Sequence, residues 1–185
     1  MRTQKLGQSA LLFLDVVQIL QLEKVNYAVI GAFALSVYGE VRGTMDVDAV
    51  LFTPPQNLTT LRAVFDRTGF ATELRRGDAD DPIPCMLVLS DDYGNRVELL
   101  GGLRGMDPEA CLRTVEIPLL GVNLTIVGRE DFIAMKCFAG RPQDVLDAQS
   151  AYRGAEGPVN LDLLRAVTRR FGRGAADNLE KVLAN

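Results

Sequence analysis

The sequence contains no histidine and no tryptophan, and its three cysteines, Cys85, Cys111 and Cys137, lie far apart. Without histidine, catalysis by Ser-His or Cys-His pairs is excluded, and no Cys-x-x-Cys pair is present to begin a zinc site. An odd number of dispersed cysteines is typical of reduced, buried thiols, as expected in a reducing cytoplasm. Any metal must therefore be held by carboxylates, and oxygen ligands favour Mg2+ or Mn2+.

Basic residues are also fewer than acidic ones: the sequence has 20 Lys and Arg and 24 Asp and Glu, which gives a formal net charge of -4. The sequence therefore lacks the overall positive charge of many nucleic-acid-binding proteins, although a local basic patch is not excluded. The most apolar stretch near the N-terminus, residues 10–22, is interrupted by Asp15, Gln18 and Gln21, and it is too short to span a bilayer. We expect a cytoplasmic protein with no membrane partner and no targeting segment.

The remaining composition, 48% hydrophobic and 24% charged over 185 residues, is that of an ordinary globular protein. Hydrophobic periodicity and turn residues predict a mixture of helices and strands up to residue 127. Helices are expected over residues 9–24, with Ser9 as the cap, 32–38, 57–68, with Asn57 as the cap, and a short one from 107. Strands are expected over 27–30, 45–52, 70–74, 85–89, 96–100, 115–120 and 122–127, with an exposed loop at 75–84.

From residue 129 onward the pattern is helical, with helices expected over 129–139, 142–152, 161–171 and 175–183. The predicted fold class is therefore α/β (α+β), a mixed sheet flanked by helices. We expect two parts, a core over residues 1–127 and a C-terminal helical region over 128–185 that packs on the core. The cluster Arg165, Arg169, Arg170 and Arg173 in this region is either a docking patch for RNA or, more commonly, a charged helix face.

Three carboxylates stand out in the predicted core. Asp46 and Asp48 are two residues apart on a predicted strand, so both side chains point to the same face. Their mutual repulsion becomes useful when a divalent cation binds between them. Glu98, on the predicted strand 96–100, completes a three-carboxylate cluster if the two strands are neighbours. Such a cluster suits phosphoryl-type transfer, whereas Asp-x-Asp by itself is most often a solvated strand start.

A glycine upstream of these carboxylates adds to the pattern. Gly31 ends the predicted strand 27–30 and opens the short helix that follows it. Backbone at such a position can approach a phosphate closely, and the helix N-terminus offers free N–H groups. Arg42 and Thr44 lie on the loop before the Asp pair, where they either reach a triphosphate or form an ordinary solvated turn.

These residues resemble the signature of the nucleotidyltransferase superfamily, whose fold is shared with DNA polymerase beta. The resemblance rests on Gly31-Ala32 followed by Arg42-Gly-Thr-Met-Asp46-Val-Asp48. It extends to residues 130–136, which end in Lys136, and to residues 141–147. The motif Arg42-Gly-Thr-Met-Asp46-Val-Asp48 is similar to that of the bacterial branch related to abortive-infection toxins and toxin–antitoxin nucleotidyltransferases. The resemblance covers about residues 27 to 152.

The resemblance implies roles for individual residues. Asp46 and Asp48 would be metal ligands, Gly31 would contact phosphate, and Glu98 takes the place of the third carboxylate, where the family commonly has Asp. Ala32 replaces the more usual second Gly or Ser and removes a hydroxyl contact to phosphate. Lys136 would contact the triphosphate or the base, although a lone lysine on such a helix usually reaches out to solvent. Asp144 and Asp147, three apart on one helix face, would support Lys136.

The leading hypothesis is a nucleotidyltransferase that uses Mg2+ or Mn2+ to move an NMP from an NTP such as ATP to a hydroxyl. The acceptor would be an RNA, a cognate toxin or antitoxin protein, or a small molecule, in a toxin–antitoxin or phage-defence setting. The acidic balance disfavours a large nucleic-acid acceptor. The alternative is a catalytically weak module of the same fold that binds a nucleotide or a protein partner, which Glu98 and Ala32 favour.

Overall fold

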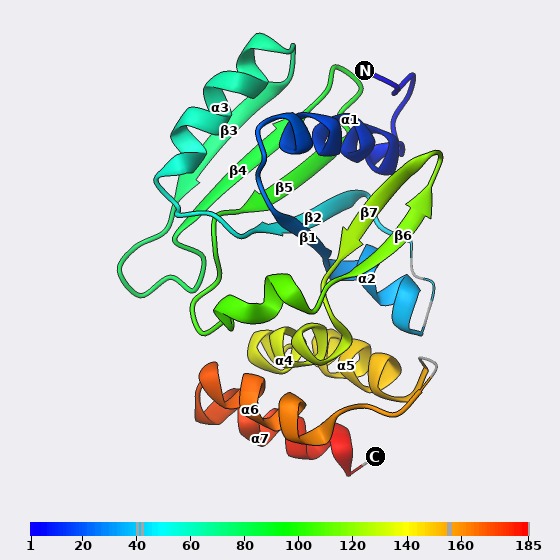
Figure 1. Ribbon diagram of the computed structural model, residues 1–185, viewed down its shortest axis with the longest axis vertical. Coiled ribbons are helices and arrows are strands. Elements are labelled where there is room, and N and C mark those ends of the chain that lie inside the picture. The colour runs from blue at the N-terminus through cyan, green and yellow to red at the C-terminus, as the bar shows by residue number, and fades with distance from the viewer. Residues whose placement is uncertain (40, 42, 155–156, 185) are drawn as a thin grey trace.

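The computed structural model describes residues 1–39, 41, 43–154 and 157–184, which form one mixed sheet with helices packed around it (Figure 1). The seven strands lie in the order β3-β4-β5-β2-β1-β7-β6. This architecture confirms the predicted α/β class. The strands are β1 (Tyr27–Ile30), β2 (Asp46–Leu51), β3 (Ala71–Arg76), β4 (Cys85–Ser90), β5 (Arg96–Leu100), β6 (Val115–Leu119) and β7 (Val122–Ile126).

The helices follow the predicted order closely. They are α1 (Ser9–Leu22), α2 (Gly31–Tyr38), α3 (Asn57–Arg67), the 3-10 helix η1 (Pro108–Leu112), α4 (Arg129–Ala139), α5 (Pro142–Gly154), α6 (Leu161–Arg170) and α7 (Arg173–Leu183). No helix in the described part of the chain is long and apolar enough to cross a membrane.

The centre of the sheet combines parallel and antiparallel pairs. Strand β2 runs parallel to β5 and antiparallel to β1, and β1 runs parallel to β7. The outer strands are added by antiparallel pairs, β3 with β4, β4 with β5, and β6 with β7. A parallel pair requires a crossover rather than a tight turn, so β2 and β5, separated by α3, β3 and β4 in the sequence, become neighbours in space.

The two faces of the sheet differ in character. On β2 and β5, buried residues such as Val47 and Val97 alternate with partly exposed charged ones, as expected when one face of a sheet lies on the core. Helix α1 packs against β2 and β5, and α3 packs against β3 and β4 (Figure 1). The charged residues of β2 and β5 therefore lie on the opposite face of the sheet.

The four C-terminal helices gather at the lower end of the sheet in Figure 1. Helix α4 contacts each of α5, α6 and α7. The segment before α4 is held by Arg113, whose guanidinium donates to both oxygens of the buried Asp131 at 2.8 Å and to Asp107 at 3.1 Å. Helix α4 is thereby fixed at one end of the central strands, where its side chains face β2 and β5.

The structure corrects two predicted helix caps. Ser9 is the first residue of α1 rather than its cap, and its hydroxyl donates to the carbonyl of Met45 and accepts from the N–H of Arg96 at 3.1 Å. Asn57 is likewise the first residue of α3, and its amide donates to Thr53. The partners of Ser9 lie far away in the sequence and are not encoded in local sequence patterns, whereas Asn57 binds a residue only four positions before it. Strand β3 also runs two residues further than predicted, to Arg76.

Candidate active site

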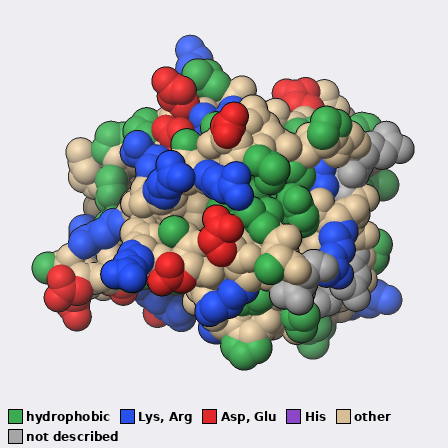
Figure 2. Space-filling view, turned by 90° about the horizontal axis from the view of Figure 1, so that it is seen from below, with side chains coloured by type: hydrophobic (Ala, Val, Ile, Leu, Met, Phe, Trp, Pro, Cys, Tyr) green, Lys and Arg blue, Asp and Glu red, His purple; other side chains and the backbone are tan. Residues whose placement is uncertain are grey.

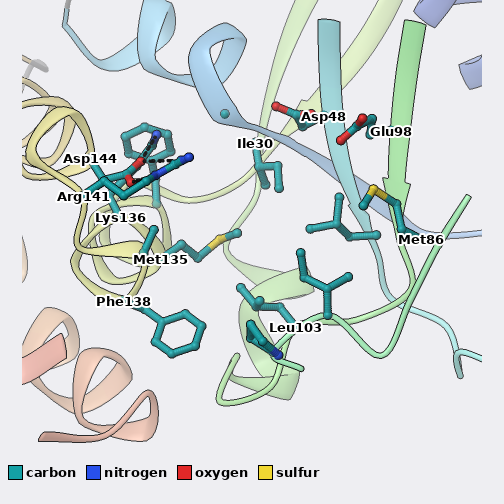
Figure 3. Close-up of a pocket in the computed structure, with 16 residues that line it drawn as sticks. Ile30, Asp48, Met86, Glu98, Leu103, Met135, Lys136, Phe138, Arg141 and Asp144 are labelled. Carbon is teal, nitrogen blue, oxygen red and sulfur yellow. Dashed lines mark hydrogen bonds and ion pairs between the residues drawn. The ribbon is translucent and has the colours of Figure 1, made fainter. Parts of the chain in front are cut away.

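The three predicted carboxylates lie on neighbouring strands. In the parallel pairing of β2 with β5, Asp48 lies opposite Glu98 and Asp46 lies opposite Arg96. All four side chains occupy the same face of the sheet, because strand residues two apart share a face. The expectation that these two strands are neighbours is therefore confirmed, and the carboxylates of Asp48 and Glu98 meet at one edge of a cavity (Figure 3).

Asp48 carries the clearest electrostatic strain at this edge. Its burial, followed by repulsion from Glu98 and then from Asp46, raises the pKa of Asp48 from 3.8 to about 6, although the positive charge of Lys136 acts in the opposite direction. Burial and two neighbouring acids disfavour the ionised form of this carboxyl group, and the protein supplies too little positive charge to offset that cost. An added cation would remove that cost, because it would favour the ionised form.

Gly31 permits Asp48 to approach the start of α2. Its φ of +67° lies in the left-handed region, and a Cβ built on it would lie 2.4 Å from Asp48 Oδ2. Both the backbone conformation and the contact therefore require glycine. Helix α2 has no side-chain cap, so its first-turn N–H groups are available beside the carboxylates. Ala32, the next residue, is 8% exposed.

Glu98 is engaged by a neighbour that the sequence analysis did not consider. Arg96 Nη2 donates to Glu98 Oε1 at 2.9 Å, and the two residues lie two apart on β5. Among the described residues, no group of three or more Asp, Glu, Cys or His side chains is arranged to hold a metal ion. The three carboxylates therefore share one face of two paired strands, and one oxygen of Glu98 is bonded to Arg96.

The loop before β2 is only partly described, and Arg42 lies outside the described residues. Thr44 is exposed, and its hydroxyl donates to the carbonyl of Asp46 at 2.7 Å and accepts from the N–H of Asp46 at 3.3 Å. These bonds form a local turn. Thr44 thus positions the backbone at Asp46. A ligand that contacts its hydroxyl would compete with these two hydrogen bonds.

A cavity of about 450 Å3 separates the carboxylates from α4 and α5. Figure 3 shows Asp48 and Glu98 on one side, Lys136, Arg141 and Asp144 on the other, and apolar side chains between them. Its volume is in the range of small-molecule sites, in which an apolar lining is combined with a few polar groups. The apolar part of the wall comes from Ile30, Pro82, Ile83, Met86, Leu100, Leu103, Phe132, Met135, Phe138 and Ala139.

Lys136 lies in a paired cluster on the far wall. Its ammonium group donates to Asp144 at 2.9 Å and to Asp147 at 2.7 Å, and it lies 5.8 Å from the centre of the Phe132 ring. Arg141 donates to Asp144 at 2.7 Å. Burial opposes ionisation of Asp144, but hydrogen bonds from Arg141 and Lys136 outweigh it and hold the pKa of Asp144 below its usual range. This geometry agrees with the expectation that the two aspartates support Lys136.

The C-terminal arginines are spread among acidic side chains. Arg165 pairs with Glu180 at 3.5 Å, and Arg173 pairs with Asp177 at 3.9 Å. Figure 2, which views the molecule from the end that carries α6 and α7, shows acidic and basic side chains interspersed on this face. This arrangement is typical of a solvated, charged helix surface.

Two residues near the site were missed by sequence reasoning, Ser9 and Arg96. The hydroxyl of Ser9 joins Met45, just before β2, to Arg96, the first residue of β5, and so helps to hold the register that places Asp48 opposite Glu98. Nothing in the local sequence distinguishes this serine from a helix cap. Arg96 did leave a signal, because a residue two positions from Glu98 on a strand must share its face.

No family model and no curated protein matches the chain in sequence. Solved structures do match it. The antibiotic-resistance factor ANT(2'')-Ia superposes with a TM-score of 0.61 at 12% identity, covering 96% of this chain and 97% of that chain. A putative nucleotidyltransferase from Thermotoga maritima, TM1012, gives 0.59 at 17% identity over 78% of this chain and 92% of that one. The lincosamide antibiotic adenylyltransferase LnuA gives 0.51 at 13% identity over 82% and 99%. The chain therefore has the nucleotidyltransferase fold, as the resemblance in its sequence predicts.

Proposed function

We propose that this protein is a metal-dependent nucleotidyltransferase that moves an NMP from an NTP, such as ATP, to a hydroxyl group. The observation that carries the proposal is the placement of Asp46, Asp48 and Glu98 on two paired strands, beside the uncapped first turn of α2. The proteins of similar fold, which include antibiotic adenylyltransferases by name, support the same class of reaction.

The residues present fit a divalent cation. Asp46 and Asp48 supply hard oxygen ligands from one face of β2, Glu98 is the third ligand from β5, and the raised pKa of Asp48 marks a charge that lacks compensation. Carboxylates of this kind suit Mg2+ or Mn2+. When bound there, the cation would neutralise charge on the triphosphate and lower the pKa of the attacking hydroxyl.

The nucleotide would occupy the cavity between the carboxylates and α4. The first-turn N–H groups of α2, from Gly31 and Ala32 onward, would bind phosphate oxygens, because the amino end of a helix attracts anions. Lys136 uses two of its three N–H donors on Asp144 and Asp147, so the third is left for the triphosphate or the base. Arg42 and Thr44, on the loop before β2, are proposed as further phosphate contacts. The apolar wall of the cavity would pack against the base.

Glu98 would accept the proton of the attacking hydroxyl. It lies opposite Asp48 across the strand pair, so an acceptor hydroxyl placed between them can reach its carboxylate. Accepting a proton requires a free carboxylate oxygen. Arg96 is bonded to Oε1 of Glu98, so the proton would go to Oε2.

The proposed acceptor is a small molecule that carries a hydroxyl. Two observations favour this over an RNA: the net charge of -4, which repels a polyanion, and the mixed charges around α6 and α7. The remaining acceptors, an RNA or a cognate toxin or antitoxin protein in the cytoplasm, are separate outcomes of the test below.

A second candidate function is favoured by one observation, the ion pair that occupies Glu98. If Arg96 holds Glu98 permanently, the protein would bind a nucleotide or a protein partner without transferring the nucleotide. Retention of both Asp46 and Asp48 argues against this alternative, because a module that only binds gains nothing from two like charges side by side.

The test is transfer of label from α-labelled NTPs in the presence of Mg2+ or Mn2+. Each of the four NTPs is incubated with a panel of hydroxyl-bearing small molecules, with total RNA, and with cell protein, and the products are separated by size. Transfer to a small molecule is expected, and Asp46→Asn should reduce it by several orders of magnitude, because the amide removes a cation ligand. Asp177→Asn, on the exposed face of α7, is the matched control. Nucleotide binding without label transfer in any arm would favour the binding module.

A further inference from the structure

Arg96 lies among acidic side chains on the open face of the sheet. It is the first residue of β5, two residues from Glu98, and the strand pairing places it opposite Asp46 on β2 and opposite Ser90 on β4. A guanidinium at this point is the one cation on β5 that shares a face with all three carboxylates. Its N–H group is fixed by the hydroxyl of Ser9, so the backbone from which the side chain projects is anchored.

The ion pair competes with a metal for Glu98. Arg96 Nη2 lies 2.9 Å from Glu98 Oε1, and the two side chains are 38% and 23% exposed. The carboxylate oxygen that accepts this bond is shared with the guanidinium, so a cation that uses the same oxygen must compete with Arg96. Among the described residues, no group of three acidic side chains is arranged to hold a metal ion, although the register places Glu98 beside Asp48. The pair is open to solvent, so it is weak enough to exchange.

A second position is available for the guanidinium. Arg96 lines a groove of about 270 Å3 over β3, β4 and β5, together with Glu73, Arg75 and Ser90. Hydrogen bonding from Arg75 lowers the pKa of Glu73, and the positive charge of Arg96 lowers it further. Glu73 therefore already attracts Arg96 from across the groove. The side chain of Arg96 can leave Glu98 and remain near a carboxylate.

From this geometry we propose that Arg96 is a positioning residue that competes with a divalent cation for Glu98 and gives up this carboxylate when the cation binds. The inference rests on the proposed function, because it takes Asp46, Asp48 and Glu98 as the ligands. The same movement would turn the guanidinium toward Glu73 in the groove, so that binding of the cation and filling of the groove would be coupled.

Binding of Mn2+ alone, followed by the magnetic resonance signal of the free ion, tests the proposal without any acceptor. Arg96→Gln removes the competing partner, so it should tighten Mn2+ binding about two- to fivefold, which is the size expected for a partly exposed ion pair. Arg96→Lys keeps a cation within reach of Glu98 and should stay near the wild-type affinity. Arg75→Gln is the matched control, since it removes the same charge from the same groove but not from Glu98, and its effect should stay below about twofold.

The double variant identifies the residue through which Arg96 acts. Glu98→Gln should weaken Mn2+ binding, and adding Arg96→Gln to it should restore nothing, because the ion pair is already absent. An unchanged or weaker affinity in Arg96→Gln would overturn the proposal, as would an equal gain in Arg75→Gln or a gain that persists without Glu98. A wild-type protein that binds no Mn2+, with or without nucleotide, would overturn the proposed function itself.

Discussion

Two groups of charged side chains face each other across the cavity, and the protein treats them differently. On α4 and α5, Lys136 and Arg141 bind Asp144 at 2.7–2.9 Å, and the pKa of that aspartate stays below its usual range. On β2 and β5, Asp48 lies beside Glu98 and Asp46, and its pKa is raised to about 6. The first group is compensated within the protein, whereas in the second the pairing of Glu98 with Arg96 leaves the pKa of Asp48 raised.

The difference separates a structural role from a binding role. Buried charges that are paired and hydrogen-bonded are costly to break but need no ligand. Like charges held together without a counter-ion cost free energy. We therefore interpret their presence in a fold as a sign that a ligand binds there. We therefore propose that β2 and β5 carry the cation site and that α4 and α5 supply the wall opposite it, from which Lys136 would offer its third donor.

The largest expected effect lies on the compensated side. Lys136→Ala would leave Asp144 and Asp147, which are 2% and 1% exposed, without their shared cation. Removing one partner of a buried ion pair costs about 3–5 kcal/mol, so we expect a loss of that size in the free energy of unfolding, measured by urea denaturation. Lys181→Ala, at an exposed position on α7, should change stability by less than about 0.5 kcal/mol. A loss below about 1 kcal/mol for Lys136→Ala would mean that the cluster is not structural.

A smaller effect, of opposite sign, is expected on the uncompensated side. Because the pKa of Asp48 is raised from 3.8 to about 6, the folded state loses stability as the pH rises from 3.8 to about 6, and the loss is constant above that range. In metal-free buffer, Asp48→Asn should therefore stabilise the protein by about 1–3 kcal/mol at pH 8 and by much less at pH 4.

Thermal unfolding at the two pH values measures this effect. Asp66→Asn serves as the control for the loss of one negative charge, because Asp66 is an exposed acid on α3 that is 49% accessible. Equal stability of wild-type and Asp48→Asn protein at pH 8 would contradict the view that the carboxylates are strained. The comparison between the two sides of the cavity would then lose its physical basis.

Sequence reasoning located the carboxylates because the pattern of a strand is local. Alternation along residues 45–52 places Asp46 and Asp48 on one face, and the structure pairs this strand with the one that carries Glu98. Gly31 was identified for the same reason, since a glycine between a strand and a helix marks a special backbone conformation. The fold followed from these elements and from the resemblance they carry.

The partners of charged side chains were harder to predict. The spacing of Asp144 and Asp147 shows only that they share one helix face, and their support of Lys136 was expected together with the family resemblance. Ser9 was assigned to a helix cap, although its hydroxyl joins the starts of β2 and β5 from far away in the sequence. Such contacts depend on which elements pack together, and periodicity within one element does not contain that information.

The position of a bound cation tests the central claim most directly. Crystals grown with Mn2+ and a non-hydrolysable NTP analogue would locate the metal by its anomalous scattering. We expect a peak bonded to Asp46 and Asp48, at roughly 2.0–2.6 Å from their oxygens, with Glu98 turned away from Arg96. A peak at Asp144 and Asp147, or bound nucleotide with no metal at Asp46 and Asp48, would contradict the account.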